Sequence, residues 1–255
     1  QAPPALPPPP RPAPQRKWQA RSPCAPRPCE RCDMIKLDIL SDPICPWCFI
    51  GWTYLARAME ARPDHPFDIE WHPFQLNPDM PAGGMDRRAY LEAKFGGQQG
   101  AVEAYMPVVE NAARAGLEID FEAIARTPNT LDAHRLLHWA GLEGRQTPTK
   151  LALFRAYFQQ GRDIGDRSVL ADLAADAGLD RAMIAQLLEG DADADNIHAR
   201  DGHARARGVT GVPTFIIAGQ HVLRGAQPTD LWTRVIDEIA EQIAGQETAP
   251  DPGAS

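Results

Sequence analysis

The sequence predicts an α/β fold in which a small sheet and its helices are interrupted by an all-helical insertion. Three patterns along the 255 residues lead to this prediction. A strand–helix–strand pattern opens the periodic part of the chain, a hairpin and a helix close it, and only helical patterns lie between them. Both ends of the periodic part therefore contribute to one layered fold.

The opening segment alternates between strand and helix. Residues 35–40 form an apolar run typical of a buried strand, and a short turn follows them. From Pro46 onward, apolar residues recur at helical spacing until Pro63, a residue that disfavours a helix interior. Residues 67–71 alternate like a second strand, which Pro73 closes.

The middle of the chain carries helical patterns and no strand pattern. Asn129 can cap one of these helices, with Asp132 at the third position, and glycines mark several helix ends. We expect an all-helical block here. Its helices are expected at residues 86–95, 101–115, 129–140, 149–159, 168–177 and 180–189.

The strand pattern returns near the end of the chain. Residues 213–217 and 221–223 flank a turn at 218–220, which predicts a β-hairpin. A final helix is expected to start near Pro228 and to end at Gly245. One face of this helix is expected to bury Leu231, Val235, Ile236, Ile239 and Ile243.

The chain thus divides into five parts. Residues 1–33 hold 11 of the 25 prolines and no periodic apolar pattern, so we predict a disordered extension and take Met34 as the natural start. Two parts of a single domain flank the helical block, and a flexible tail ends the chain. The two parts of the domain are predicted at 34–76 and 191–245, the helical insertion at 77–190 and the tail at 246–255.

Charge and hydropathy exclude several functions. Residues 1–33 carry +4, which leaves −12 on the remainder of a chain whose total is −8. A body this acidic does not suit nucleic acid or anionic membrane surfaces as partners. No run of about 18 apolar residues occurs, and no secretory signal is apparent. We expect a cytoplasmic monomer or homodimer with one working dithiol.

The most informative motif is Cys-Pro-Trp-Cys at residues 45–48, between the first strand and the first helix. A cysteine at a helix N-terminus faces free N–H groups and the positive end of the helix dipole, which favour the thiolate. We therefore expect Cys45 to be an exposed thiolate, with Cys48 one turn deeper to displace a partner bound to it. This spacing next to a strand–helix–strand pattern is typical of thioredoxin-like redox proteins.

Five segments together resemble FrnE-like members of the DsbA superfamily, and the likeness covers nearly all of the chain after Met34. The resemblance implies a thioredoxin fold with a helical insertion, and protein disulfide oxidoreductase or isomerase activity. The segments are SDPICPWCFIG at 41–51, PFQLNP at 73–78, RTPNT at 126–130, GRDI at 161–164 and GVPTF at 211–215.

The resemblance also implies roles for single residues. Cys45 corresponds to the nucleophilic cysteine and Cys48 to the resolving one. Pro213 corresponds to the cis-proline that faces the dithiol, with Val212 presenting an extended edge to a substrate. The expected substrate-binding residues are Pro46, Trp47, Val212, Pro213 and Asn129.

Two departures from the family pattern affect the expected chemistry. Strongly oxidising DsbA proteins have Pro-His between the cysteines, where this chain has Pro-Trp, so we expect a less oxidising pair. Thioredoxin and DsbA also place a buried carboxylate under the dithiol. Asp38 is the strand acid near the cysteines and is therefore the candidate proton relay, the alternative being a partly solvated acid.

Other interpretations remain open. Glutathione-dependent isomerases and transferases share this fold but have serine in place of Cys45, and glutathione is a candidate co-substrate. A four-cysteine zinc site would use Cys29, Cys32, Cys45 and Cys48 in a binding module. A non-catalytic glutathione-binding or chaperone-like protein is a third alternative. No metal or bound cofactor is predicted, and ordinary hydrogen bonds are favoured for His134 and His138 over metal binding.

Overall fold

A computed structural model describes residues 34–247. The predicted disordered extension at 1–33, with Cys29 and Cys32, lies outside the described residues, as does the predicted tail beyond residue 247. The domain boundaries proposed above stay predictions. The individual helices and strands, however, can be compared with the structure.

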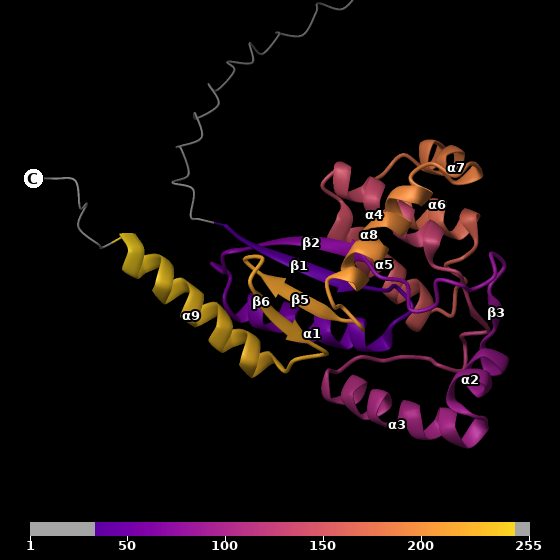
Figure 1. Ribbon diagram of the computed structural model, residues 1–255, viewed down its shortest axis with the longest axis horizontal. Helices are drawn as coiled ribbons and strands as arrows, with labels where there is room; N and C mark the ends of the chain where they lie inside the picture. The colour runs from indigo at the N-terminus through magenta and orange to yellow at the C-terminus, as the bar shows by residue number, and fades with distance from the viewer. Residues whose placement is uncertain (1–33, 248–255) are drawn as a thin grey trace, which may run out of the picture. The chain divides into compact units, whose positions relative to one another are not determined.

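A four-stranded mixed sheet in the order β2-β1-β5-β6 forms the centre of the described part (Figure 1). β1 (Ile35–Ser41) pairs in parallel with β2 (Phe67–Pro73) and antiparallel with β5 (Thr214–Ile217). β6 (His221–Arg224) completes the sheet beside β5. All four strands were predicted, and their bounds lie within two residues of the prediction.

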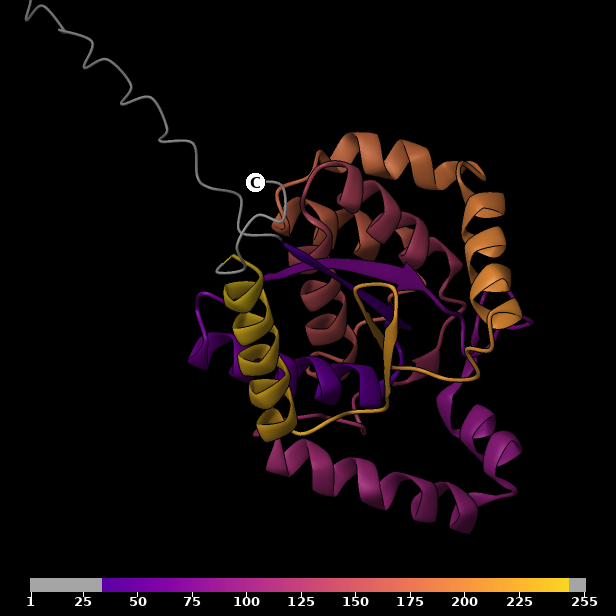
Figure 2. The same ribbon diagram turned by 60° about the vertical axis from the view of Figure 1, so that its left-hand side comes forward.

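Two helices cover one face of this sheet. α1 (Pro46–Ala61) and α9 (Thr229–Glu247) lie side by side (Figure 2). The fully buried Trp232 of α9 packs on Phe215 of β5, with ring centroids 4.8 Å apart. The predicted apolar face of α9 omitted Trp232, and Ile236 is the one predicted residue that becomes fully buried. The helix also continues two residues beyond the predicted end at Gly245.

The opposite face of the sheet is covered by α8 (Ala194–Ala206). Its Arg200 donates a hydrogen bond to Nδ1 of His72 at 3.0 Å and lies 3.5 Å from the Glu70 carboxylate. Side chains at alternate positions of β1 therefore have different surroundings. Leu37 and Ile39 face the apolar core, whereas Asp38 faces the side of the sheet that carries these charges.

Six helices lie between β2 and α8. Three of them begin after an aspartate, Asp86, Asp166 or Asp180, whose side chain accepts a hydrogen bond from the first turn. The helices are α2 (Arg87–Phe95), α3 (Gln98–Arg114), α4 (Leu131–Leu142), α5 (Gln146–Phe158), α6 (Arg167–Asp176) and α7 (Arg181–Glu189).

The expectation that this block contains no strand is wrong. β3 (Met85–Asp86) and β4 (Arg126–Thr127) form a two-stranded antiparallel ladder. Two residues are too short to give an alternating pattern, so the sequence carries no strand signal here. Gly84 permits the ladder, because its φ is +68° and a Cβ there would lie 2.6 Å from the Thr127 carbonyl oxygen.

The predicted cap of α4 also differs from the structure. Thr130 is the residue that precedes the helix, and Asn129 lies one position earlier. The Asn129 side chain nevertheless accepts a hydrogen bond from the Leu131 N–H at 2.9 Å, so it satisfies one free donor of the first turn. The helix continues through Gly141, where the prediction ended it.

Candidate active site

Cys45 lies where the chain passes from β1 into α1. It precedes the helix with extended backbone angles (φ −87°, ψ 112°), and Pro46 occupies the first helical position. The turn before it is closed by a hydrogen bond from the Cys45 N–H to the Asp42 carbonyl at 3.0 Å. The Cys48 N–H donates back to the Cys45 carbonyl at 3.1 Å, which brings the two cysteines onto one turn. Both are free thiols.

The loop before β5 meets this turn. The Val212–Pro213 peptide bond is cis, and the Cys45 sulfur lies 3.6 Å from the Val212 carbonyl oxygen. Gly51, one turn beyond Cys48, allows the close approach, because a Cβ there would lie 3.2 Å from Cγ of Pro213. The loop and α1 are therefore in direct contact beside the dithiol.

A groove of about 240 Å³ opens over the first cysteine. Cys45, Pro46, Trp47 and Val212 line it, together with residues of α2 and α3, whereas Cys48 does not. Cys45 is 3% exposed and Cys48 is 1% exposed. Cys45 is thus more buried than we expected, yet it is the sulfur that borders the groove.

Two buried charged residues lie beneath the dithiol. Asp42 follows β1, and its carboxylate accepts hydrogen bonds from the Leu76 N–H at 2.7 Å and from the Ile44 N–H at 3.3 Å. Lys150 comes from α5 and is fully buried against the ring of Phe154. Its ammonium group forms no hydrogen bond within residues 34–247. The Lys150 charge acts on Cys48 and on Asp42.

Burial shifts the pKa of each of these two groups in the direction that favours the uncharged form. Burial raises the pKa of Asp42 to about 6, although its hydrogen bonds and Lys150 act in the opposite direction. Burial likewise lowers the pKa of Lys150 to about 8, opposed by the negative charge on Cys48 and Asp42. Near neutral pH, both groups are therefore close to the point at which they gain or lose a proton.

The two thiols are in hydrogen-bond contact and share their ionisation. Burial raises the pKa of Cys45, and the neighbouring Cys48 sulfur raises it further. Cys48 is equally buried, but the hydrogen bond from Cys45 and the Lys150 charge hold the pKa of Cys48 below its ordinary value. Burial opposes the helix-terminus effect at Cys45, so the directions of the two pKa values favour Cys48, and not the expected Cys45, as the first thiol of the pair to ionise.

Asp38, the sequence candidate for a proton relay, is not next to the cysteines. Its carboxylate lies 2.8 Å from Nε2 of His72 and 3.3 Å from the Lys36 ammonium, on the α8 side of the sheet. The carboxylate beside the dithiol is that of Asp42. Sequence reasoning assigned Asp42 to a turn, and turns are usually exposed.

Lys150 was also missed, although the sequence does carry a signal for it. Lys150 precedes Phe154 by four residues, and Phe158 follows four residues later, so all three lie on one face of the predicted helix. A lysine on an apolar helix face is a candidate for a buried charge. Phe49 and Trp52, in contrast, fill the core, where Phe49 stacks on Phe154 at 5.0 Å.

The remaining predicted substrate-binding residues lie in different positions. Pro213 is buried behind Val212 and does not line the groove. Asn129 does not line it either. The Asn129 side chain donates to the Met80 carbonyl at 2.7 Å and accepts from the Gln75 side chain at 3.3 Å, so it joins two loops.

Within residues 34–247, one group of three histidine or acidic side chains could hold a metal ion. Asp38, Glu70 and His72 are close enough to share a metal ion, but Lys36 and Arg200 already pair with them. His134 and His138 belong to no such group. The four-cysteine zinc site stays a prediction, because two of its cysteines lie outside the described residues. No helix within residues 34–247 has the length and apolar character needed to cross a membrane.

A family model described as a DSBA-like thioredoxin domain matches residues 36–237. The chain belongs to this family. Because the match extends from β1 into α9, the DsbA-like domain includes the dithiol, the cis-proline loop and the helical block between them. The FrnE-like subtype remains a prediction.

Three proteins illustrate the DsbA-like relationship. The protein YwbO of Bacillus subtilis (strain 168) is 29% identical over 205 residues, covering 80% of this chain and 96% of its own length. The structure of a probable DsbA oxidoreductase from Streptomyces coelicolor is 29% identical, with a TM-score of 0.71 over 85% of this chain and 93% of that chain. DsbM, a cytosolic disulfide reductase from Pseudomonas aeruginosa solved with GSH, is 20% identical (TM-score 0.59, 81% and 99% covered) and shares the fold.

Proposed function

We propose that this protein is a thiol–disulfide oxidoreductase that exchanges the Cys45–Cys48 dithiol with protein or small-molecule disulfides. One observation carries the proposal: two free thiols in hydrogen-bond contact on the first turn of α1, with the groove open to Cys45 alone. Membership of the DsbA-like family supports the same chemistry.

The first step forms a mixed disulfide. The Cys45 sulfur attacks one sulfur of the substrate disulfide, whose S–S bond breaks as the new bond forms. The proton of Cys45 passes along its hydrogen bond to the Cys48 thiolate, and the departing substrate thiolate takes a proton from solvent. The Val212 carbonyl, 3.6 Å from the Cys45 sulfur, lies at the edge of the groove where an extended substrate would pair.

The second step closes the protein disulfide. Cys48 must lose its proton before it attacks the Cys45 sulfur and releases the second substrate thiolate. Asp42 is the acceptor we assign to that proton, because its pKa of about 6 is high for a carboxylate and Lys150 stabilises its ionised form. Two electrons pass from the dithiol to the substrate. In the reverse direction, the oxidised pair accepts two electrons from a dithiol.

We further propose a FrnE-like enzyme of the cytoplasm, acting as reductase or isomerase, with glutathione as co-substrate. Pro-Trp in place of Pro-His removes a cation that would stabilise the thiolate, which favours a less oxidising pair. DsbM is a cytosolic protein whose structure was solved with GSH, and these are properties of DsbM. A reduction potential nearer to thioredoxin (about −270 mV) than to DsbA (about −120 mV) is expected.

Two serine variants test the proposed function. Cys48→Ser removes the resolving sulfur, so incubation with glutathione disulfide should accumulate a glutathione adduct on Cys45, detected by mass spectrometry. Cys45→Ser is the matched control and should accumulate none, because Cys48 does not reach the groove. Both variants should lose insulin reductase activity. Wild-type activity in Cys45→Ser, or an adduct on Cys48 in that variant, would contradict the proposal.

A further inference from the structure

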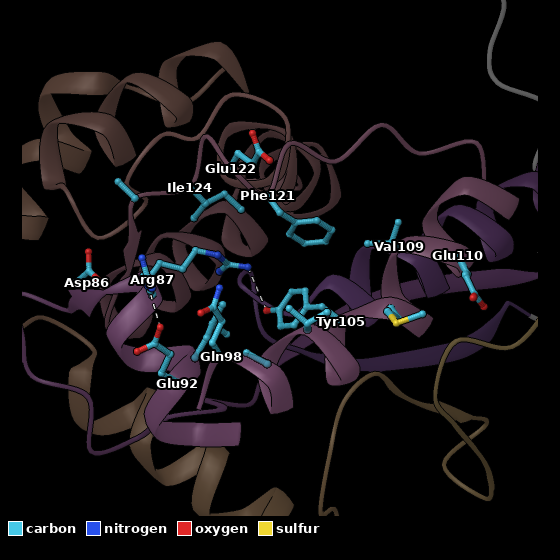
Figure 3. Close-up of a pocket in the computed structure, with 16 residues that line it drawn as sticks. Asp86, Arg87, Glu92, Gln98, Tyr105, Val109, Glu110, Phe121, Glu122 and Ile124 are labelled. Carbon is cyan, nitrogen blue, oxygen red and sulfur yellow. Dashed lines mark hydrogen bonds and ion pairs between the residues drawn. The ribbon is translucent and has the colours of Figure 1, made fainter. Parts of the chain in front are cut away.

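Arg87, the first residue of α2, is a buried cation close to the dithiol groove. It is 7% exposed, and its guanidinium donates to the Tyr105 hydroxyl at 3.1 Å and to the Tyr157 hydroxyl at 3.2 Å. Figure 3 shows the side chain extending from α2 toward Tyr105 of α3, near the ring of Phe121. The guanidinium carbon lies 5.4 Å from the Tyr105 ring centre and 5.8 Å from that of Phe121.

None of these partners carries a compensating charge. Arg87 forms no ion pair within residues 34–247. Burial raises the pKa of both Tyr105 and Tyr157, so the two phenols stay neutral at physiological pH. An unpaired buried charge is costly and is rarely retained without a partner.

A second buried arginine shows what a structural guanidinium looks like in this fold. Arg135 is 1% exposed, and it pairs with the Asp132 carboxylate at 2.5 Å. It also donates to the backbone carbonyls of Ala192 at 2.6 Å and Leu187 at 2.8 Å. Arg135 is thus neutralised within the fold, whereas Arg87 retains its charge and part of its donor capacity.

The position of Arg87 connects it to the reacting sulfur. It lines the groove that contains Cys45 and also the adjoining cavity of about 940 Å³. Lys94, seven residues later on the same face of α2, is a second cation in the groove, and it too forms no ion pair within the described part of the chain. No aspartate or glutamate lines the groove, although residues after 33 carry a net charge of −12.

We infer that Arg87 binds a carboxylate of the substrate while the substrate sulfur reacts at Cys45, and that the groove therefore selects small disulfides and thiols that carry carboxylates. The guanidinium presents a planar pair of donors that matches a carboxylate. Lys94 provides a second positive charge for a substrate with more than one carboxylate. This inference rests on the proposed function and specifies its substrate class.

Three small disulfides with the same two-methylene spacer between the sulfur and the terminal group test the inference in the full-length reduced protein. They are 3,3′-dithiodipropionate, bis(2-hydroxyethyl) disulfide and cystamine, which end in a carboxylate, a hydroxyl and an ammonium group. The measurement is the rate of Cys45–Cys48 oxidation, normalised to the rate at which each disulfide oxidises dithiothreitol. We expect dithiodipropionate to react about tenfold faster than the neutral compound and cystamine to react slowest, a difference that salt should reduce.

A pair of neighbouring arginines provides the matched variants. Arg87→Gln should abolish the preference for dithiodipropionate over the neutral disulfide. Arg88→Gln should preserve the order, because Arg88 is exposed, lies outside the groove and pairs with Glu92. If Arg87→Gln does not fold, the order among the three disulfides in the wild type, with its salt dependence, still decides the question.

The outcomes separate the two proposals. Equal normalised rates for the three disulfides, or an equal loss of all three rates in a folded Arg87→Gln variant, would overturn carboxylate selection and leave the oxidoreductase intact. Failure of all three to oxidise the dithiol would overturn the proposed function together with this inference. A fast reaction with cystamine would show that the groove does not select for negative charge.

Discussion

Two aspartates four residues apart, Asp38 and Asp42, have opposite surroundings. Asp38 lies within β1 on the side of the sheet that α8 covers, where it contacts Lys36 and His72 and solvent reaches it. Asp42 lies just beyond the strand, with no exposed surface, and burial raises its pKa to about 6. Desolvation raises the pKa of a buried carboxyl group. The distance of that group from the cysteines along the chain does not determine its pKa.

The contrast between Asp42 and Asp38 should have its largest effect on folding stability. The folded-state pKa of Asp42 lies above its ordinary value, so ionisation costs folding free energy as the pH rises toward about 6. Between pH 4.5 and 7.5, wild type should lose about 2 kcal/mol relative to Asp42→Asn, which has no proton to release. Urea unfolding of both proteins at these two pH values measures the loss.

The matched control for this experiment is Asp38→Asn. Its stability difference from wild type should not follow the Asp42 titration between the two pH values. If the difference between wild type and Asp42→Asn is the same at pH 4.5 and 7.5, Asp42 is not the buried titrating acid, and the contrast with Asp38 fails.

A somewhat smaller effect is expected when the buried cation is removed. Lys150 lowers the pKa of Cys48, so Lys150→Met should raise the first pKa of the dithiol and reduce the thiolate population at pH 7. The ultraviolet absorbance of the thiolate, followed against pH, reports this shift.

Lys36→Met is the control for the lysine variant, because Lys36 is half-exposed and pairs with Asp38 and Glu70. It should leave the thiol titration unchanged. An unchanged titration in Lys150→Met would mean that the charge on α5 does not act on the sulfurs.

The smallest effect is expected at Asp38 itself. Its pairs with Lys36 and His72 are partly exposed, so Asp38→Asn should cost less than about 1 kcal/mol at pH 7. Insulin reduction should proceed at the wild-type rate. A slower rate together with a shifted thiol pKa would restore Asp38 as a proton relay and contradict the assignment to Asp42.

The sequence predicted those parts of the fold that have a local signal. The run before Cys45, the helix that ends before Pro63 and the hairpin after Pro213 each show a clear period or a turn, and the structure has all three. The ladder of β3 and β4 has only two residues in each strand, and therefore no period to read.

The site was also predictable only in part, because only some of its residues have a local signal in the sequence. The Cys-Pro-Trp-Cys motif is contiguous in the sequence, so the dithiol could be located from the sequence alone. Lys150 and Arg87 lie more than 30 residues away from it in sequence and reach it only through the packing of α5 and α2. Burial, which displaces the pKa values of Asp42 and the thiols, arises from tertiary packing and has no local signature.

Gly51 determines how closely the cis-proline loop can approach α1. With no side chain at this position, Pro213 rests directly on the helix that carries both cysteines. A side chain at residue 51 would have to displace Pro213, and with it the neighbouring Val212 carbonyl that lies 3.6 Å from the Cys45 sulfur. A small residue on the helix therefore sets the width of the gap in which a disulfide must fit.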